Sequence, residues 1–137
     1  MTTEAQIAAL FDRWNAALQT LDPKAVAALY APDAVLLPTV SNQVRRTPAE
    51  IEDYFVRFLQ KRPRGTILQA NIRIFGDLAI DSGVYAFDLT TEEGDTPVLC
   101  RYTFVYRRDG DDWRIIEHHS SFMPEYTARP GTPEAAA

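Results

Sequence analysis

The spacing of the hydrophobic residues changes once along the chain, close to Gly65, and this change limits the folds that the sequence can adopt. Before Gly65, hydrophobic residues recur with the period of a helix, and after it they alternate as they do in strands. Helices grouped before strands are typical of an α+β domain, in which the helices cover one face of an antiparallel sheet. We therefore expect an α+β fold.

Three helices are predicted before Gly65, and each begins at a residue type that caps helices. Thr3 has a glutamine three positions later, as in a capping box, and the other two caps are each followed by proline. A short apolar run at 34–37 predicts a strand between the second and third helices. The three caps are Thr3, Asp22 and Thr47.

Four long strands are predicted after Gly65, at 66–75, 78–91, 96–107 and 113–123. The segments between them are short and rich in Gly, Asp and Glu, which is typical of hairpin turns. Short connections make consecutive strands neighbours, so the sequence predicts an antiparallel meander. Strands of this length twist and coil, and the sheet should therefore be strongly curved.

The length, charge and cysteine content of the chain limit the classes of protein to which it can belong. Its 137 residues fit one domain, predicted at 1–124 with a flexible tail at 125–137, and the lone Cys100 cannot form an internal disulfide. The net charge of −5 and the scattered 14 Lys and Arg argue against nucleic acid as a partner. Without a signal-like start or a membrane-length apolar run, we expect a cytoplasmic protein with no membrane contact.

Both faces of the strand at 96–107 carry hydrophobic residues. One face has the residues from Val98 to Tyr106 at even positions, and the other has Leu99 and Val105 with Arg101 and Thr103 between them. The helices can cover only one face, so a second copy of the chain would cover the other and form a homodimer. The alternative is an outer face with scattered apolar residues, which is common on monomers.

The order of these elements resembles a known fold family. Trp14, the 34–38 strand, the run Arg107-Arg108-Asp109-Gly110, Trp113 and the ending His119-x-Ser121 are similar to the cone-shaped fold of nuclear transport factor two. Within that family the chain resembles the association domain of calcium/calmodulin-dependent protein kinase II, over roughly residues 4 to 124. The family also includes SnoaL-like enzymes.

The resemblance implies three helices packed on a strongly curved antiparallel sheet, with a pocket between them. It implies self-association through the outer sheet face, as a homodimer or a larger ring. No kinase motif is present, so we expect a stand-alone relative without kinase activity. The arginines that hold a carboxylate in kinase hub domains fall at Asp88, Thr103 and Ser120, so that ligand preference does not transfer.

The catalytic residues of the ketosteroid isomerases, which share the fold, are also missing. By the resemblance, their first-helix tyrosine falls at Trp14, their base aspartate at Pro38 and their second oxyanion acid near Arg101. Because proline cannot take up a proton and indole is a much weaker acid than phenol, that mechanism is disfavoured.

Arg101 is the most informative charge, because a half-buried guanidinium needs an anionic or carbonyl partner. It can pair with Asp88 or Glu117 on neighbouring strands, or it can orient the carboxylate or carbonyl of a ligand. His118 and His119 are adjacent on a strand and so project to opposite faces, which argues against a shared metal. No metal site and no cofactor are predicted.

The resemblance places His119 and Ser121 on the pocket side. A pocket histidine can act as a general acid or base, or be a neutral histidine held by core hydrogen bonds. Ser121 would be a nucleophile only with a base within reach. Trp14, Tyr30, Tyr54 and Phe58 lie on buried helical stripes and are either plain core or the pocket wall.

Three functions are consistent with these patterns. The first is a homo-oligomeric module that binds a small organic ligand in the pocket. The second is a SnoaL-like isomerase, cyclase, dehydratase or hydrolase that uses His119 with Arg101 or Asp88 as catalytic residues, and the third is a structural dimer with a filled interior. The predicted ligand-binding residues are Trp14, Tyr30, Tyr54, Phe58, Arg101, Thr103, His119 and Ser121.

Overall fold

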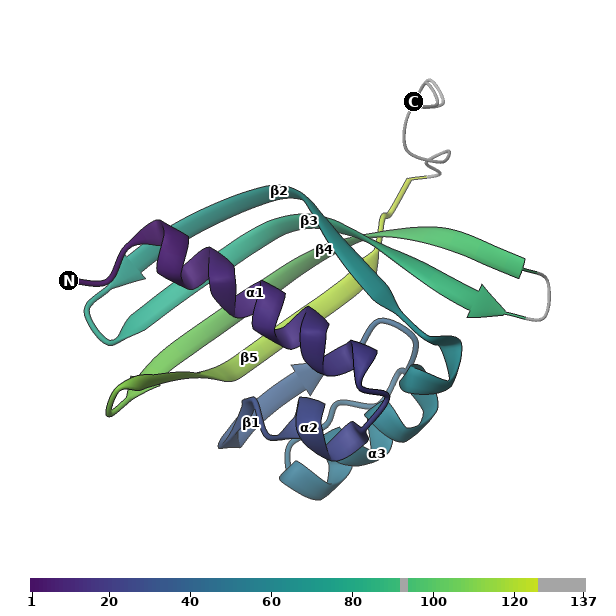
Figure 1. The fold of residues 1–137 in the computed structure, drawn as a ribbon, viewed down its shortest axis with the longest axis horizontal. Coiled ribbons are helices and arrows are strands. Elements are labelled where there is room, and N and C mark those ends of the chain that lie inside the picture. Colours follow the sequence, from purple (N-terminus) through teal and green to yellow (C-terminus); the bar gives the residue numbers. More distant parts are fainter. Residues whose placement is uncertain (92–93, 126–137) are drawn as a thin grey trace.

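The computed structural model describes residues 1–91 and 94–125 and contains the predicted helices and a five-stranded sheet (Figure 1). The helices are α1 (Glu4–Gln19), α2 (Pro23–Ala27) and α3 (Pro48–Phe58), and the 3-10 turn η1 (Leu59–Lys61) follows α3. The strands are β1 (Tyr30–Leu37), β2 (Arg64–Phe75), β3 (Leu78–Thr91), β4 (Gly94–Asp109) and β5 (Asp112–Phe122). Except for Glu125, the predicted tail lies outside the described residues.

The three predicted helix caps are confirmed. Thr3 Oγ1 accepts from the backbone N–H of Gln6 at 3.2 Å, and the Gln6 side chain accepts from the N–H of Thr3 at 2.8 Å, which completes a capping box. Asp22 caps α2 and Thr47 caps α3, in each case with proline in the first turn. These caps satisfy amide groups that would otherwise be left unpaired at the helix starts.

The strand order in the sheet is β1-β5-β4-β3-β2. Strands β2 to β5 form the predicted antiparallel meander, but β1 pairs with β5 in parallel. The predicted α+β fold and antiparallel meander are confirmed, but the sheet has five strands and not four, because the strand predicted at 34–37 joins it in parallel to β5. The short β1 run joins an edge of the sheet whose partner strand is remote in sequence, and hydrophobic spacing alone does not reveal such a pairing.

The helices cover one face of the sheet, and α1 lies across that face (Figure 1). Large aromatic side chains fill the space between α1 and the sheet. Trp14 packs edge-on against Phe104 at 5.5 Å between ring centroids and against Phe87 at 5.9 Å. This closed aromatic core explains how a chain without a disulfide among its described residues buries enough apolar surface to fold.

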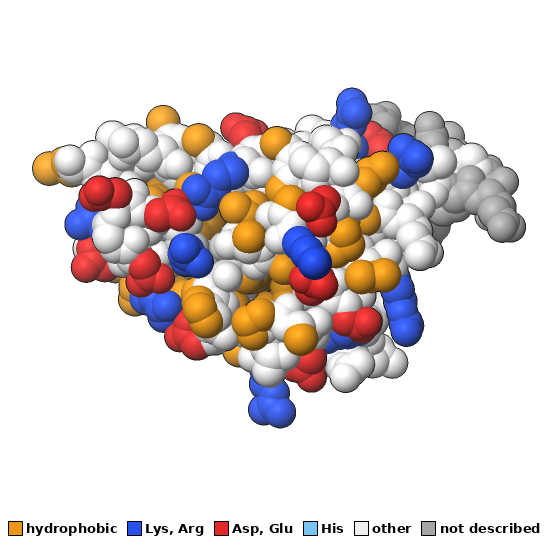
Figure 2. All heavy atoms as spheres, turned by 60° about the horizontal axis from the view of Figure 1, so that its bottom comes forward, with side chains coloured by type: hydrophobic (Ala, Val, Ile, Leu, Met, Phe, Trp, Pro, Cys, Tyr) orange, Lys and Arg blue, Asp and Glu red, His pale blue; other side chains and the backbone are white. Residues whose placement is uncertain are grey.

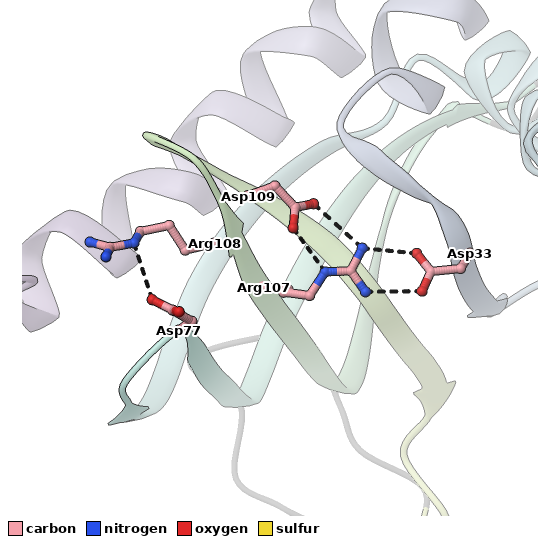
Figure 3. Close-up of polar contacts among 5 residues, drawn as sticks. All are labelled: Asp33, Asp77, Arg107, Arg108 and Asp109. Carbon is pink, nitrogen blue, oxygen red and sulfur yellow. Dashed lines mark hydrogen bonds and ion pairs between the residues drawn. The ribbon is translucent and has the colours of Figure 1, made fainter.

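The Arg107-Arg108-Asp109-Gly110 run ties the end of the sheet together (Figure 3). Arg107 makes a bidentate contact with Asp33 of β1, at 2.9 and 3.0 Å, and a further contact with Asp109 at 3.0 Å. Arg108 pairs with Asp77 in the neighbouring hairpin at 3.3 Å. The hydrogen bonds from Arg107 hold the pKa of the Asp33 carboxyl below its usual value. These contacts give the motif a structural role.

The surface carries mixed charges. Figure 2 shows hydrophobic side chains near the middle of one face, with basic and acidic side chains around and between them. On that face no single charge forms an extended stripe. None of the described helices is long and apolar enough to cross a membrane.

Candidate functional site

A small pocket lies inside the domain, between α1, α3 and the inner face of the sheet. Its apolar wall is largely aromatic, from Trp14, Tyr54, Phe55, Phe58 and Phe87. Its free volume is about 10 Å³, which is roughly the space that one water molecule needs. In this conformation the pocket is therefore almost filled by its own side chains.

His118 forms the polar centre of the pocket. Its ring is buried, lies 4.0 Å from the ring of Phe104 between centroids and is hydrogen-bonded at both nitrogens. Nδ1 lies 2.7 Å from the Tyr30 hydroxyl, and Nε2 lies 3.2 Å from the Tyr85 hydroxyl. A neutral imidazole donates at one nitrogen and accepts at the other, so this pair of phenols suits the uncharged ring.

Trp14 determines the simplest assignment of the hydrogens. Its Nε1–H can only donate, and it lies 3.2 Å from the Tyr30 oxygen. The Tyr30 hydroxyl is then free to donate to Nδ1 of His118, which leaves Nε2–H to donate to Tyr85. The result is a chain of hydrogen bonds from α1 through β1 to the middle of the sheet.

Burial keeps this network uncharged. Desolvation lowers the pKa of His118 to about 3, and the neighbouring His119 adds a smaller repulsive contribution. Desolvation also raises the pKa values of Tyr30 and Tyr85 well above their usual value. At neutral pH the pocket therefore offers hydroxyl and imidazole groups but no charge from these three residues.

The network continues toward the loop after β1. Tyr85 is hydrogen-bonded to Ser120, and Thr39 donates to Ser120 Oγ. Cys100 is buried beside the hydroxyls of Thr39 and Ser120, and desolvation raises the pKa of its thiol to about 11. The residues that line the pocket thus carry polar groups at Thr39, Tyr85, His118 and Ser120, in addition to the indole N–H of Trp14 and the hydroxyl of Tyr54.

Arg45 fastens the loop after β1 onto α3, next to the pocket. Its guanidinium pairs with Asp53 at 2.7 Å, donates to the Glu50 carbonyl at 3.1 Å and lies 5.9 Å from the centre of the Tyr54 ring. Its backbone also pairs with that of Leu36. Arg45 does not line the pocket, so its role here is to hold α3 and Tyr54 in place.

Four of the predicted ligand-binding residues come together at the pocket. Trp14, Tyr54 and Phe58 line it directly, and Tyr30 reaches it through the hydrogen bond to His118. The other four, Arg101, Thr103, His119 and Ser121, lie beside one another on the opposite, outer face of the sheet. The prediction that His119 and Ser121 face the pocket is therefore wrong.

A β-bulge in β5 determines which side chains of this strand face the pocket. At the hairpin, Asp109 pairs with Asp112 and Tyr106 pairs with Ile115, but Val105 pairs with Glu117. The extra residue, Ile116, shifts the alternation of side chains by one position. Without it, residues 117, 119 and 121 would face inward, as predicted; with it, His118 and Ser120 do.

Asp88 also lies away from the pocket. It is exposed on β3, where it pairs in register with Arg64 of β2, and it lines a separate surface groove. Acid–base chemistry in the pocket by His119 with Arg101 or Asp88 therefore has no support from the geometry. Among residues 1–91 and 94–125, no three His, Cys, Asp or Glu side chains come close enough together to hold a metal ion.

Fold and pocket together define a cone-shaped domain of the nuclear transport factor two-like class, with an aromatic interior and a neutral histidine at its polar end. The family model of the calcium/calmodulin dependent protein kinase II association domain matches residues 3–124. The chain belongs to this family, and the predicted resemblance is confirmed. None of the curated proteins matches the chain.

Solved structures agree with this assignment. A Xanthomonas campestris protein, provisionally assigned as an association domain of the same kinase, is 54% identical, with 91% of each chain covered and a TM-score of 0.87. A nuclear transport factor two-like protein of unknown function from Pseudomonas putida is 21% identical, covers 98% of this chain and 95% of its own, and has a TM-score of 0.75. A candidate ketosteroid isomerase from Parabacteroides distasonis is 19% identical over 90% and 89%, with a TM-score of 0.70. The last two show the fold alone.

Proposed function

We propose that this protein is an association module that forms a homodimer through the outer face of its sheet. The observation that carries the proposal is an apolar stripe along the two central strands. Two apolar pairs of outward side chains face each other on β3 and β4, Ile80 with Val105 and Ala86 with Leu99, and all four are half-buried or buried within one chain. Between them lie Ser82 opposite Thr103 and Val84 opposite Arg101.

Polar residues flank this stripe on both sides. On β2 the outward positions beside it are the exposed Gln69, Asn71 and Arg73, and on β5 they include the exposed Glu117 and His119. An apolar centre with a polar rim is the usual composition of a protein interface. Arg101 lies within the stripe, opposite Val84, and arginine is enriched in such interfaces.

Light scattering coupled to gel filtration tests the dimer. The wild type should elute with twice the 15.5 kDa mass of one chain. The double variant Leu99→Glu/Val105→Glu should elute as a monomer, because two buried carboxylates per chain, placed opposite the apolar Ala86 and Ile80, oppose the contact. Val56→Glu is the matched control, since Val56 is an exposed apolar residue on α3 and lies off the sheet. A monomeric wild type, or a Val56→Glu variant that dissociates equally, would contradict the proposal.

A second candidate function rests on the polar end of the pocket. We infer that the pocket takes a small uncharged compound with one hydroxyl or carbonyl group. Its lining residues include no Asp, Glu, Lys or Arg, and the His118 ring is neutral at physiological pH. A carboxylate would be buried there without a counter-charge, at a cost of several kcal/mol.

Entry of such a compound requires rearrangement, because the free volume holds only about one water molecule. The rings of Tyr54, Phe55 and Phe58 all belong to α3, so an outward shift of this helix would enlarge the pocket. Thermal unfolding with phenol, cyclohexanone and benzoate as probes tests the inference. Phenol or cyclohexanone should raise the melting temperature and benzoate should not, and Ser120→Val should weaken the effect. Stabilisation by benzoate alone, or by none of the three, would remove this function.

A further inference from the structure

A surface groove lies at one end of the molecule, outside the interior pocket. Its lining residues come from the end of α1 and the residues after it, the residue after η1, the start of β2 and the end of β3. Its volume is about 580 Å³, so it can hold a small molecule without rearrangement. The groove is lined by Gln19, Leu21, Arg62, Arg64, Asp88 and Thr90.

The backbone beneath the groove is held firmly by α1. Asn15 exchanges two hydrogen bonds with the backbone of Gly65, at 2.9 and 3.0 Å, and Gln19 donates to the Pro63 carbonyl at 3.0 Å. These bonds fix the residues on both sides of Arg64. Pro63 is fully buried, which anchors the segment further. Arg64 therefore projects from a rigid base, which lowers the entropy lost when its guanidinium binds a ligand.

The backbone of Arg62 has a conformation that is uncommon for a residue other than glycine. It follows η1 with a φ of 47°, in the left-handed region, and its N–H donates to the Leu59 carbonyl at 3.0 Å. Glycine is the residue that adopts this conformation at least cost. This chain instead has an arginine at that position, in a backbone conformation that is strained for a residue with a side chain. Such strain often marks a residue that is needed for its side chain.

The two guanidinium groups in the groove lack ionic partners among the described residues. Arg64 pairs in register with Asp88, yet no ion pair within 4.0 Å joins them or involves Arg62. Four other arginines, by contrast, are each bound to an aspartate: Arg13, Arg45, Arg107 and Arg108. The groove therefore combines two available forked donors on a rigid base.

We propose that this groove binds a small oxyanion, a carboxylate or a phosphate, through Arg62 and Arg64. Planar guanidinium groups match both anions with paired hydrogen bonds. Asp88 lies at the edge of the groove and opposes an anion there, so it limits the affinity. The groove shares no lining residue with the interior pocket or with the apolar stripe of the outer face, so its test does not depend on either function proposed above.

Amide NMR titrations of the full chain test the site, with succinate and pyrophosphate as separate probes. One or both should cause saturable shifts centred on residues 62–65 and Leu21, and the tighter probe identifies the preferred anion. Arg62→Gln and Arg64→Gln should each weaken that affinity about tenfold, as expected for the loss of one charge-assisted contact. The amide spectrum of each variant also reports whether it is folded.

Two further variants separate a site from general charge attraction. Arg46→Gln removes the same charge from an exposed position before α3, outside the groove and off the sheet, and should leave the affinity unchanged within about twofold. Asp88→Asn should strengthen binding, opposite in direction to the arginine variants. The proposal is overturned if neither probe gives saturable shifts at 62–65, if Arg46→Gln weakens binding as much as Arg64→Gln, or if Asp88→Asn weakens it.

Discussion

Acidification should destabilise this protein through one buried histidine. His118 is 3% exposed, and burial lowers its pKa from 6.5 to about 3 in the folded state. In the unfolded chain the ring is in water and its pKa returns to about 6.5. Between these two pH values His118 is protonated in the unfolded chain but not in the folded protein, so the free energy of unfolding falls as the pH falls.

The size of the effect follows from the two pKa values. Below pH 6.5, each further pH step of one favours protonation of the unfolded chain by about 1.4 kcal/mol. At about pH 4.5 the contribution of His118 is therefore a loss of about 3 kcal/mol relative to about pH 7.5. This is a large part of the 5–15 kcal/mol that typically stabilises a domain.

Urea unfolding at the two pH values, followed by tryptophan fluorescence, measures the loss. The comparison is with His118→Gln, because glutamine can still donate and accept hydrogen bonds but does not titrate. His118→Gln should be less stable than the wild type at about pH 7.5 but should lose about 3 kcal/mol less on acidification. Carboxylates that titrate in the same range are common to both proteins and cancel in the difference.

His119→Gln is the matched control for this experiment. His119 is the adjacent residue, and its side chain is exposed on the outer face, away from the buried hydrogen bonds that His118 makes with Tyr30 and Tyr85. The variant should lose as much stability as the wild type on acidification. The reasoning about the pocket is refuted if the wild type and His118→Gln lose the same free energy, or if His119→Gln is the variant that resists acid.

Three further outcomes follow from buried groups. Burial raises the pKa of Asp81, so the free energy of unfolding falls as the pH rises through that pKa. Asp81→Asn can still accept the hydrogen bond from Tyr102, and it should raise the urea midpoint of unfolding at about pH 7.5. Near pH 4 the variant and the wild type should have similar midpoints. Cys100, with a pKa of about 11, should react with a thiol reagent only as fast as the protein unfolds, as followed by absorbance. Gly65→Ala would bring its Cβ within 2.9 Å of the Phe11 ring, and calorimetry should show a loss of about 1–3 kcal/mol.

Most of the fold could be predicted from local patterns. Capping residues are read directly from the sequence, because the side chain and the amide that it binds are two or three positions apart, as at Thr3 and Thr47. The hairpins likewise depend on short turns. The parallel pairing of β1 with β5 could not be predicted this way, because it joins residues far apart in the sequence, such as Leu36 and His118, and no turn or cap between them indicates the contact.

The candidate site was predicted less well than the fold. Trp14, Tyr54 and Phe58 were found because helical spacing identifies a buried face without knowledge of its partner. Which side chains of β5 face inward depends on the register of β5 with β4, and the one extra residue of the bulge exchanges the inward and outward sets. A signal did exist, since Cys100, Tyr102 and Phe104 define the inner face of β4 and their partners are Phe122, Ser120 and His118. Using it requires locating the bulge.

The bulge at Ile116 also links the two proposed roles of the sheet. By shifting the register it puts His118, which suits a neutral interior, among the aromatic rings, and it leaves His119 on the outer face with Glu117 and Arg101. In the other register a carboxylate, a histidine and a serine would face the core, and burial of the carboxylate without a partner would cost several kcal/mol. The bulge thus keeps the Glu117 carboxylate out of the pocket and places Glu117 and His119 at the rim of the outer face, so the pocket and the proposed dimer surface depend on the same feature of β5.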